Sequence, residues 1–583
     1  MTRRDTARRK GASSAVQRHP GPEGTTLQLL SPLTPVAAAV SVLTLLGSAL
    51  VAYIPATRAG YVRFDDTDYI QENPLLRTTQ GLRQIWTSPL AYPPGVPFYP
   101  VTFTLHWAEW HIWGTNASGY HLVSIGLHAV NAVLVWLLLR RLHVPGALFG
   151  ALLFAVHPVQ VQSVAWLAER KNVLAGLFYF LTALAWLRFA RTGSWPLYGV
   201  ALVMFLLGLL SKTVICTLPI ALLLWVWWRR PSPARKHVLL VLPFLGLAVL
   251  LVAVVIWREN TLLEGKSFAS GLSPIERLLI AGRAPWLYAG KLLLPINLIP
   301  IYPHWRVDAR AITQYAFPLG TAAAVAVAWL LRRRLGRAPL VAVLFFTISL
   351  APTSGLVDFG YLAKSFVGDH YLYIPSLALF AGLASLGAKL AARILPLPLR
   401  EGAGGGLSAA AAAAVLAFGL GARTWRQCDV YHDPETFWGY VVAHNPSPTA
   451  LSALGDVYLL KKDLTRAEDL LRQALTQRDS APARFRLGCV LIERQQFAAA
   501  AEQFERGLSL NRTQDGIRGL NARLLYNLGH CYWSTGDRTR AADAFRQAAE
   551  LDPSMTAAKQ WLAFAEPAAR SQPAPATSAT QQP

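Results

Sequence analysis

The chain has 583 residues, of which 53% are hydrophobic and only 15% are charged. In a water-soluble protein about a quarter of the residues are usually charged, so this composition excludes a protein that is soluble throughout. The 55 Lys and Arg residues against 32 Asp and Glu residues give a formal charge of +23. Most of these basic residues flank apolar segments, which indicates a membrane protein rather than a nucleic-acid-binding one.

Residues 1–24 are basic, polar and rich in turn residues, and we predict a disordered cytoplasmic tail. Apolar segments of about 20 residues, the length that crosses a bilayer, recur from residue 33 onward. The first is too long for a cleaved signal peptide. Residues 25–423 are therefore predicted to form an all-α membrane bundle of about eleven spans. The spans are expected at 33–54, 119–139, 146–164, 170–190, 195–212, 213–229, 238–257, 314–331, 338–357, 371–394 and 406–423.

The basic residues between the spans predict the orientation. With the N-terminus in the cytoplasm, the densest basic clusters all fall on the cytoplasmic side, as the positive-inside rule requires. The clusters are Arg140–Arg141, Arg188 with Arg191, and residues 229–237, 332–337 and 389–400. The apolar segment 278–300 is predicted to be interfacial or re-entrant, because a further span would break this alternation. The first loop, about 55–118, and everything after 423 then face the extracytoplasmic side.

From residue 447 onward the composition changes to charged, amphipathic helix. Leu-Gly pairs open three helical segments, and small residues follow each glycine at the same two offsets. The recurring residues are Gly455, Gly488 and Gly529, then Ala467, Ala500 and Ala541, then Ala474, Gly507 and Ala548. Small residues at these offsets let two antiparallel helices approach closely, which is typical of tetratricopeptide repeats of about 34 residues.

We therefore predict a soluble tetratricopeptide α-solenoid at residues 424–566. Repeat arrays of this kind offer a concave binding surface, so docking of a partner or substrate is the favoured role. A passive spacer or a dimerisation element is the alternative. The tail 567–583 is rich in Pro, Ala, Ser and Thr and is predicted to be disordered.

Three acids, Asp65, Asp66 and Asp68, open the first extracytoplasmic loop in a chain where acids are scarce. An Asp held at a membrane interface can act as a general base on an acceptor hydroxyl; a solvated turn or a helix cap is the alternative. Farther on, His121 and His128 are seven residues apart and share a helix face. Without a third ligand this pair favours polar helix packing over a metal site.

Charged residues also gather at the extracytoplasmic ends of later spans. His157 lies near the end of one span, and Glu169, Arg170 and Lys171 precede the next. Cations on this side run against the positive-inside trend, so anchoring of the helix explains them poorly. Guanidinium and ammonium groups stabilise phosphate charge, and Lys212 is a similar exception on the same side.

The loop LAKSFVGDHYLYIPS brings further candidates to this side, namely Lys364, Asp369, His370, Tyr371 and Tyr373. Acids and phosphate-binding cations are thus expected to meet on one membrane face, and the pattern predicts a lipid-phosphate substrate. The four cysteines are widely spaced and indicate neither a disulfide framework nor a zinc site.

Several motifs in this order resemble a known family. They are FDD, GYHLVSIGLHAVNA, HPVQVQSVAWLAERKNVLAG, LLSKTVICTLP, GDHYLYIPS and WGYVVAHNPSPTALSALG. Over nearly all of residues 33–565 the chain looks like bacterial multispanning tetratricopeptide proteins. These are similar to the eukaryotic TMTC group of O-mannosyltransferases and, more distantly, to protein O-mannosyltransferases. The resemblance implies a GT-C membrane fold, a polyprenyl- or dolichyl-phosphate sugar donor, and transfer on the lumenal or periplasmic face.

The resemblance also places the catalytic acid at Asp65 or Asp66. The chain departs from the family pattern at two positions. Gln162 stands where relatives often carry a glutamate, so a charge-based role there is in doubt. His370 stands where bacterial relatives often carry an arginine, so phosphate binding at this position would depend on protonation of the imidazole.

These observations predict a glycosyltransferase that moves mannose or another hexose from a polyprenyl-phosphate donor to a protein Ser/Thr hydroxyl, with inversion. Asp65 or Asp66 would be the base. Arg170, Lys171, Lys212 and His370 would bind the donor phosphate. The supporting residues would be Asp68, His121, His157, Glu169, Asp369 and Tyr371. The protein is expected in the bacterial inner membrane.

No metal and no other cofactor is expected, and no nucleic acid. The expected partners are the polyprenyl-phosphate sugar, membrane lipid and an acceptor polypeptide in the repeat groove. A non-enzymatic scaffold or assembly factor is the main alternative, although about eleven spans are more than an anchor needs. A glycan polymerase or ligase is another. A transporter is less favoured, because buried charges within the spans are few.

Overall fold

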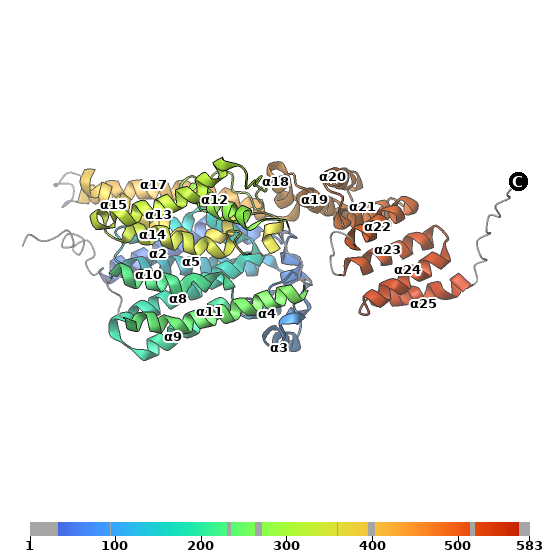
Figure 1. The fold of residues 1–583 in the computed structure, drawn as a ribbon, viewed down its shortest axis with the longest axis horizontal. Coiled ribbons are helices and arrows are strands. Elements are labelled where there is room, and N and C mark those ends of the chain that lie inside the picture. Colours follow the sequence, from blue (N-terminus) through green and yellow to red (C-terminus); the bar gives the residue numbers. More distant parts are fainter. Residues whose placement is uncertain are drawn as a thin grey trace, which may run out of the picture.

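The computed structural model describes residues 33–93, 95–229, 235–262, 271–357, 360–394, 403–512 and 519–570. Throughout these ranges the regular structure is helical, with no strand. Figure 1 shows a bundle of long, roughly parallel helices and a smaller array of paired helices that extends from one end of it. The chain is therefore an all-α multi-pass membrane protein with a C-terminal helical array, as predicted.

A helix occurs at each predicted membrane span. The helices of the bundle are α2 (Pro35–Ala52), α5 (Ala117–Arg141), α6 (Ala147–Val156), α7 (Val161–Ala165), α8 (Arg170–Thr192), α9 (Trp195–Leu209), α10 (Leu218–Arg229), α11 (Arg235–Leu262), α12 (Pro274–Leu293), α13 (Ala316–Leu335), α14 (Ala338–Leu350), α15 (Ser376–Ile394) and α17 (Ala403–Cys428). By length and composition, six of the described helices can cross a membrane, and a bent pair adds a seventh. Three further apolar helices are shorter, so the count of eleven stays a prediction.

The bent pair is α6 and α7, whose axes differ by 50°. The break falls at His157, because Pro158 has no backbone N–H to continue the helix. The imidazole stabilises the break: its Nδ1 accepts from the backbone N–H of Val159 at 3.2 Å. Its Nε2 donates to the carbonyl of Leu292 on α12 at 3.1 Å. His157 thus holds two helices together.

The segment 278–300 is helical up to Leu293 and irregular, with several bends, beyond it. Helix α12 begins with a capping box between Ser273 and Glu276 and continues to Leu293. The change of chain direction expected of an interfacial or re-entrant segment therefore lies after the end of this helix. There Lys291 Nζ donates to the carbonyls of Ile296 and Asn297, each at 2.8 Å. Helix α12 is not among the described helices that are long and apolar enough to cross a membrane.

The first loop is folded rather than extended. It contains α3 (Thr79–Thr87), α4 (Pro100–Trp113) and several single helical turns. The start of α4 is fixed to the end of α9, since Thr102 Oγ1 donates to the carbonyl of Ser211 at 2.9 Å. The backbone N–H of Val101 likewise donates to the carbonyl of Leu210 at 3.2 Å. The loop is therefore docked on the bundle and can place side chains accurately.

The C-terminal array consists of paired helices, as the repeat spacing predicts. They are α18 (Pro434–His444), α19 (Pro448–Leu460), α20 (Leu464–Gln477), α21 (Ala481–Glu493), α22 (Phe497–Leu510), α23 (Leu520–Ser534), α24 (Arg538–Leu551) and α25 (Thr556–Arg570). A Cβ atom on Gly455, Gly488 or Gly529 would lie 2.9, 2.4 or 2.7 Å from the side chain of Leu471, Phe504 or Phe545. The recurring glycines therefore permit the close helix contact inferred from the sequence.

The substitution Gly488→Ala should loosen the middle repeat. The added methyl group would overlap the ring of Phe504, and overpacking of this kind costs about 1–3 kcal/mol. We expect faster hydrogen exchange in peptides from α21 and α22 of the full chain. Gly439→Ala on α18 is the control, since nothing lies within 4 Å of its added Cβ; equal exchange in both variants would contradict the close-contact explanation.

The predicted disordered tails lie mostly outside the described residues. This holds for residues 1–24 and for 571–583. The boundary set at Pro567 falls within α25, which continues to Arg570 with the proline inside it. Packing explains the longer helix, because Ala565 is fully buried and the last helix lies against α24.

Candidate functional site

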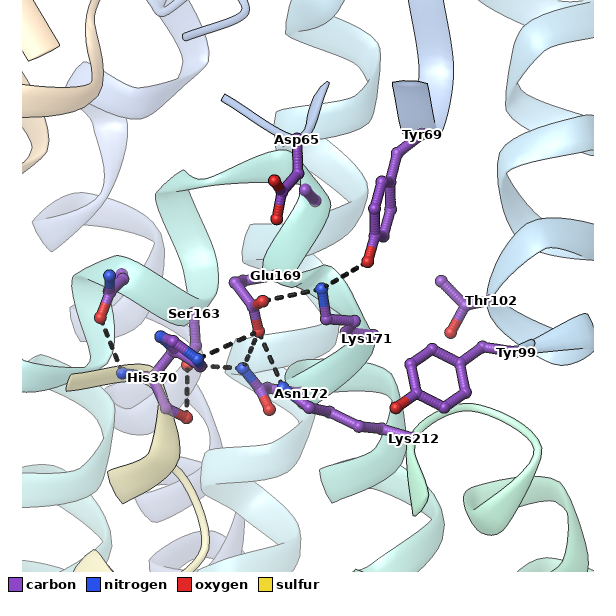
Figure 2. Close-up of polar contacts among 12 residues, drawn as sticks. Asp65, Tyr69, Tyr99, Thr102, Ser163, Glu169, Lys171, Asn172, Lys212 and His370 are labelled. Carbon is purple, nitrogen blue, oxygen red and sulfur yellow. Dashed lines mark hydrogen bonds and ion pairs between the residues drawn. The ribbon is translucent and has the colours of Figure 1, made fainter. Parts of the chain in front are cut away.

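A buried charge cluster lies at the N-terminus of α8. Glu169 Oε1 is 2.7 Å from Lys171 Nζ, and Glu169 Oε2 is 2.9 Å from Lys212 Nζ. All three side chains are at most 8% exposed. Two ammonium groups therefore share one carboxylate. Figure 2 shows the three side chains converging from α8 and from the turn after α9.

Polar and aromatic groups surround this cluster. Asn172 Nδ2 donates to Glu169 Oε2 at 2.6 Å, and Lys171 Nζ donates to the hydroxyl of Tyr69 at 3.1 Å. Lys212 Nζ lies 5.5 Å from the ring centre of Tyr371. The Glu169 carboxylate thus has its partners, whereas the two cations together keep an excess positive charge that an anion would balance.

Asp66 joins the first loop to this cluster through the backbone. Its side chain is buried, and its two carboxylate oxygens accept from the N–H groups of Val62 at 3.0 Å and Ala168 at 2.9 Å. Burial raises the pKa of Asp66 to about 6, although these two hydrogen bonds oppose the rise. Both oxygens of Asp66 are therefore engaged in holding the loop against the entry to α8.

Asp65 is the more accessible of the two aspartates. Its side chain is 27% exposed, and its carboxylate pairs with Lys364 Nζ at 3.3 Å. In Figure 2 its carboxylate points toward Glu169 and Lys171. Asp68, also in this loop, has its pKa raised by burial and by the charge of Asp65. Asp65 is thus a partly exposed carboxylate directed toward the cluster.

Arg170 faces away from the two lysines. Its guanidinium group donates to the carboxylate of Glu109 and to the backbone carbonyl of Tyr120. Its Nε donates to Ser124 Oγ at 2.8 Å, and the side chain is fully buried. The donors of the Arg170 guanidinium are thus used by groups of the protein itself, so the geometry favours Lys171 and Lys212 over Arg170 as phosphate ligands.

Glu109 was not anticipated from the sequence. It lies on α4, is 2% exposed, and also accepts from His106 Nδ1 at 3.3 Å. The sequence did contain a signal for a buried ion pair, since Glu109 is the one acidic residue in the aromatic-rich segment 106–113. A buried acid requires a partner, and here that partner is Arg170.

The loop after α14 forms another wall of the site. The backbone N–H of His370 donates to Gln162 Oε1 at 2.9 Å, and Gln162 Nε2 donates to the carbonyl of Pro300 at 2.9 Å. An amide can accept and donate at once, whereas a carboxylate cannot donate. Gln162 therefore has a bridging role here that needs no charge.

His370 and Asp369 lie side by side with different partners. His370 Nε2 is 4.0 Å from Glu169 Oε2, and burial lowers the pKa of the imidazole to about 3. Asp369 accepts from the hydroxyl of Tyr302 at 2.9 Å, and burial raises its pKa to about 7. The ring of Tyr371 lies against that of His370 at a tilt of 51°, with 3.9 Å between the ring centres. His370 is thus a neutral neighbour of the cluster.

The remaining predicted histidines lie outside the cluster. His157 stabilises the break described above. His121 is fully buried on α5. His128 donates to the carbonyl of Ala155 at 3.1 Å and accepts from the hydroxyl of Tyr373 at 2.9 Å, which is polar helix packing. Within the described ranges, no group of three or more His, Cys, Asp or Glu residues is arranged to hold a metal ion.

Two families match separate parts of the chain. Residues 95–257 match the family described as "Dolichyl-phosphate-mannose-protein mannosyltransferase". Residues 438–482 and 485–556 match tetratricopeptide repeats. The chain thus joins a region similar to this mannosyltransferase family to a tetratricopeptide array. The mannosyltransferase-family region contains Glu109, Glu169, Lys171 and Lys212, whereas Asp65 and His370 lie outside the matched residues.

Several relatives are named as protein O-mannosyl-transferases. The chain is 30% identical over 181 residues to Protein O-mannosyl-transferase Tmtc1 of Drosophila melanogaster, covering 29% of this chain and 20% of the relative. It is 31% identical over 189 residues to Tmtc2 of the same organism, covering 29% and 20%. For human TMTC4 the identity is 28% over 172 residues, covering 25% and 23%. The chain thus spans about a fifth of the length of these relatives.

Proposed function

We propose that the protein is an integral-membrane glycosyltransferase of the GT-C type. It transfers a hexose from a polyprenyl-phosphate donor to a Ser or Thr hydroxyl of a polypeptide on the extracytoplasmic face. Mannose is the favoured sugar, because the matched family and the relatives are named for mannosyl transfer. The single observation that carries the proposal is the accessible Asp65 facing the two lysines that share Glu169.

The reaction follows from the charges of these groups. Asp65 accepts the proton of the acceptor hydroxyl as its oxygen attacks the anomeric carbon. The bond between that carbon and the phosphate oxygen breaks, and Lys171 and Lys212 stabilise the negative charge left on the phosphate. Since one base and one leaving group suffice for a single displacement, the configuration at the anomeric carbon is inverted.

In this proposal the repeat array presents the acceptor polypeptide. Arg523 on α23 packs over Phe485 of α21, with 4.7 Å between the guanidinium carbon and the ring centre. Burial raises the pKa of Asp68 in the first loop, and Arg523 is among the cations that oppose this rise. Arg523 of the array is therefore near enough to the first loop to affect the charge of Asp68, which supports a role of the array beside this loop.

The proposal is tested with the full chain in lipid nanodiscs. It is supplied with polyprenyl-phosphate carrying radiolabelled mannose and with an extracytoplasmic protein extract as acceptor. We expect label in protein that is released by β-elimination, as for O-linked sugar. GDP-mannose without lipid carrier is the donor control and should give no label. Label in a glycan rather than in protein would indicate a glycan ligase or polymerase, and no transfer at all would favour the scaffold alternative.

The rate of transfer should not depend on titration of His370. Because burial keeps the pKa of this imidazole near 3, the side chain is neutral from pH 5 to 8. We expect His370→Gln to leave the shape of the pH–rate profile unchanged in this range. An inflection near pH 6.5 that disappears in the variant would show instead that a protonated imidazole binds the phosphate.

The same shift predicts a pH dependence of stability. An unfolded histidine has a pKa of about 6.5, so below that pH the unfolded chain takes up a proton that folded His370 does not. Its contribution therefore lowers stability as the pH falls from about 6.5 toward 3. Thermal unfolding of His370→Gln should show a smaller loss between pH 7 and pH 5 than the wild type shows.

A further inference from the structure

A large apolar cavity lies at the end of the bundle opposite the charge cluster. Its volume is about 530 Å³, and it lies between the ends of α5 and α8 and the helices α9, α10 and α11. Helix α8 has 23 residues, or about 34 Å at 1.5 Å per residue. It carries the cluster at its N-terminus and lines the cavity with residues between Leu181 and Arg191. Arg188 and Arg191 follow Glu169 by about 28–33 Å along the helix, which is about the thickness of a bilayer core.

The cavity has an apolar wall and a basic rim. Leu137, Leu181, Leu184 and Met204 are among the wall residues. Three further lining residues are Arg141, Arg188 and Arg191, all of them exposed. No ion pair joins these three arginines to an acid in the described part of the chain. The sequence explains this, since Glu169, at the other end of α8, is the only acid between residues 110 and 258.

We propose that this cavity binds an anionic phospholipid of the leaflet opposite the donor site. Its phosphate lies against Arg141, Arg188 and Arg191, and an acyl chain enters the apolar space between α8 and α9. Guanidinium groups bind phosphate with paired hydrogen bonds. The volume is within the roughly 300–1,000 Å³ of ligand sites. Charge complementarity selects an anionic lipid over a neutral one, and the separation along α8 distinguishes this site from that of the donor.

The test measures lipid retention and does not depend on transfer activity. The full chain is purified in detergent, incubated with dioleoyl-phosphatidylglycerol or dioleoyl-phosphatidylcholine, and examined by native mass spectrometry. We expect phosphatidylglycerol to remain bound at least about tenfold more often than phosphatidylcholine. The triple variant R141Q/R188Q/R191Q should lose this preference. These side chains are exposed and pair with no acid in the described structure, so the variant should fold.

A matched control removes the same charge elsewhere. Arg332, Arg333 and Arg334 form the last turn of α13 and do not line the cavity. The variant R332Q/R333Q/R334Q should therefore retain phosphatidylglycerol like the wild type. Ala185→Phe fills the cavity without changing charge, and it should also reduce retention. Equal loss in both arginine variants, equal binding of the two lipids, or full retention by Ala185→Phe would each overturn the proposal.

Discussion

Replacing Asp65 with Asn should lower the rate of sugar transfer by roughly 10²–10⁴-fold, the contribution typical of a general base. The amide has nearly the same shape but cannot accept the proton of the acceptor hydroxyl. Stability should change little, because the ion pair with Lys364 is about a third exposed on both sides and such pairs contribute less than about 1 kcal/mol. Initial rates and thermal unfolding of the purified variant provide both measurements.

Two neighbouring variants separate catalysis from structure. Glu72→Gln removes an exposed carboxylate from the same loop and should leave the rate unchanged. Asp66→Asn should lower the unfolding temperature, because one of the two backbone N–H groups bound by Asp66 would then face an amide NH₂. A buried donor without an acceptor costs about 1–3 kcal/mol. Full activity of Asp65→Asn would exclude Asp65 as the base.

The second large effect is expected for Glu169→Gln. The carboxylate is 5% exposed and is the shared partner of Lys171 and Lys212. Removing its charge leaves two buried ammonium groups without an anion, and breaking a buried pair in this way costs about 3–5 kcal/mol. We expect a clear fall in the thermal unfolding temperature of the purified protein, as well as loss of transfer.

A double variant checks the electrostatic explanation. Glu169→Gln with Lys212→Met removes one of the two cations together with the carboxylate, so the uncompensated charge is smaller. The double variant should therefore be more stable than Glu169→Gln alone. If the single variant unfolds at the wild-type temperature, the cluster contributes no net stability and the charge argument is wrong.

The sequence was sufficient for the large-scale organisation. Apolar segments of bilayer length predict the bundle, and the spacing of Gly455, Gly488 and Gly529 predicts the array, because both patterns depend only on local periodicity. The sequence also predicts that Asp65, Lys171 and Lys212 lie on one membrane face, because acids and unexpected cations both occur at the extracytoplasmic ends of the spans.

Finer features of the site depend on contacts between distant segments. Nothing local distinguishes Asp65 from Asp66; the distinction comes from the backbone N–H of Ala168, which occupies Asp66. Arg170 and Lys171 are adjacent in the sequence, yet the start of α8 turns the first toward Glu109 and the second toward Glu169. Side-chain direction at a helix start is decided by which partners the fold brings near, and one sequence does not show those partners.

The shared carboxylate of Glu169 has a consequence for the pace of the proposed reaction. A sugar-bearing lipid phosphodiester carries a single negative charge, whereas the spent carrier is a monoester that carries nearly two at neutral pH. Lysines that ease bond cleavage therefore hold the spent carrier more tightly than the fresh one. We therefore expect carrier exchange, rather than bond making, to limit the turnover number of the proposed reaction, and added polyprenyl monophosphate to act as a competitive inhibitor.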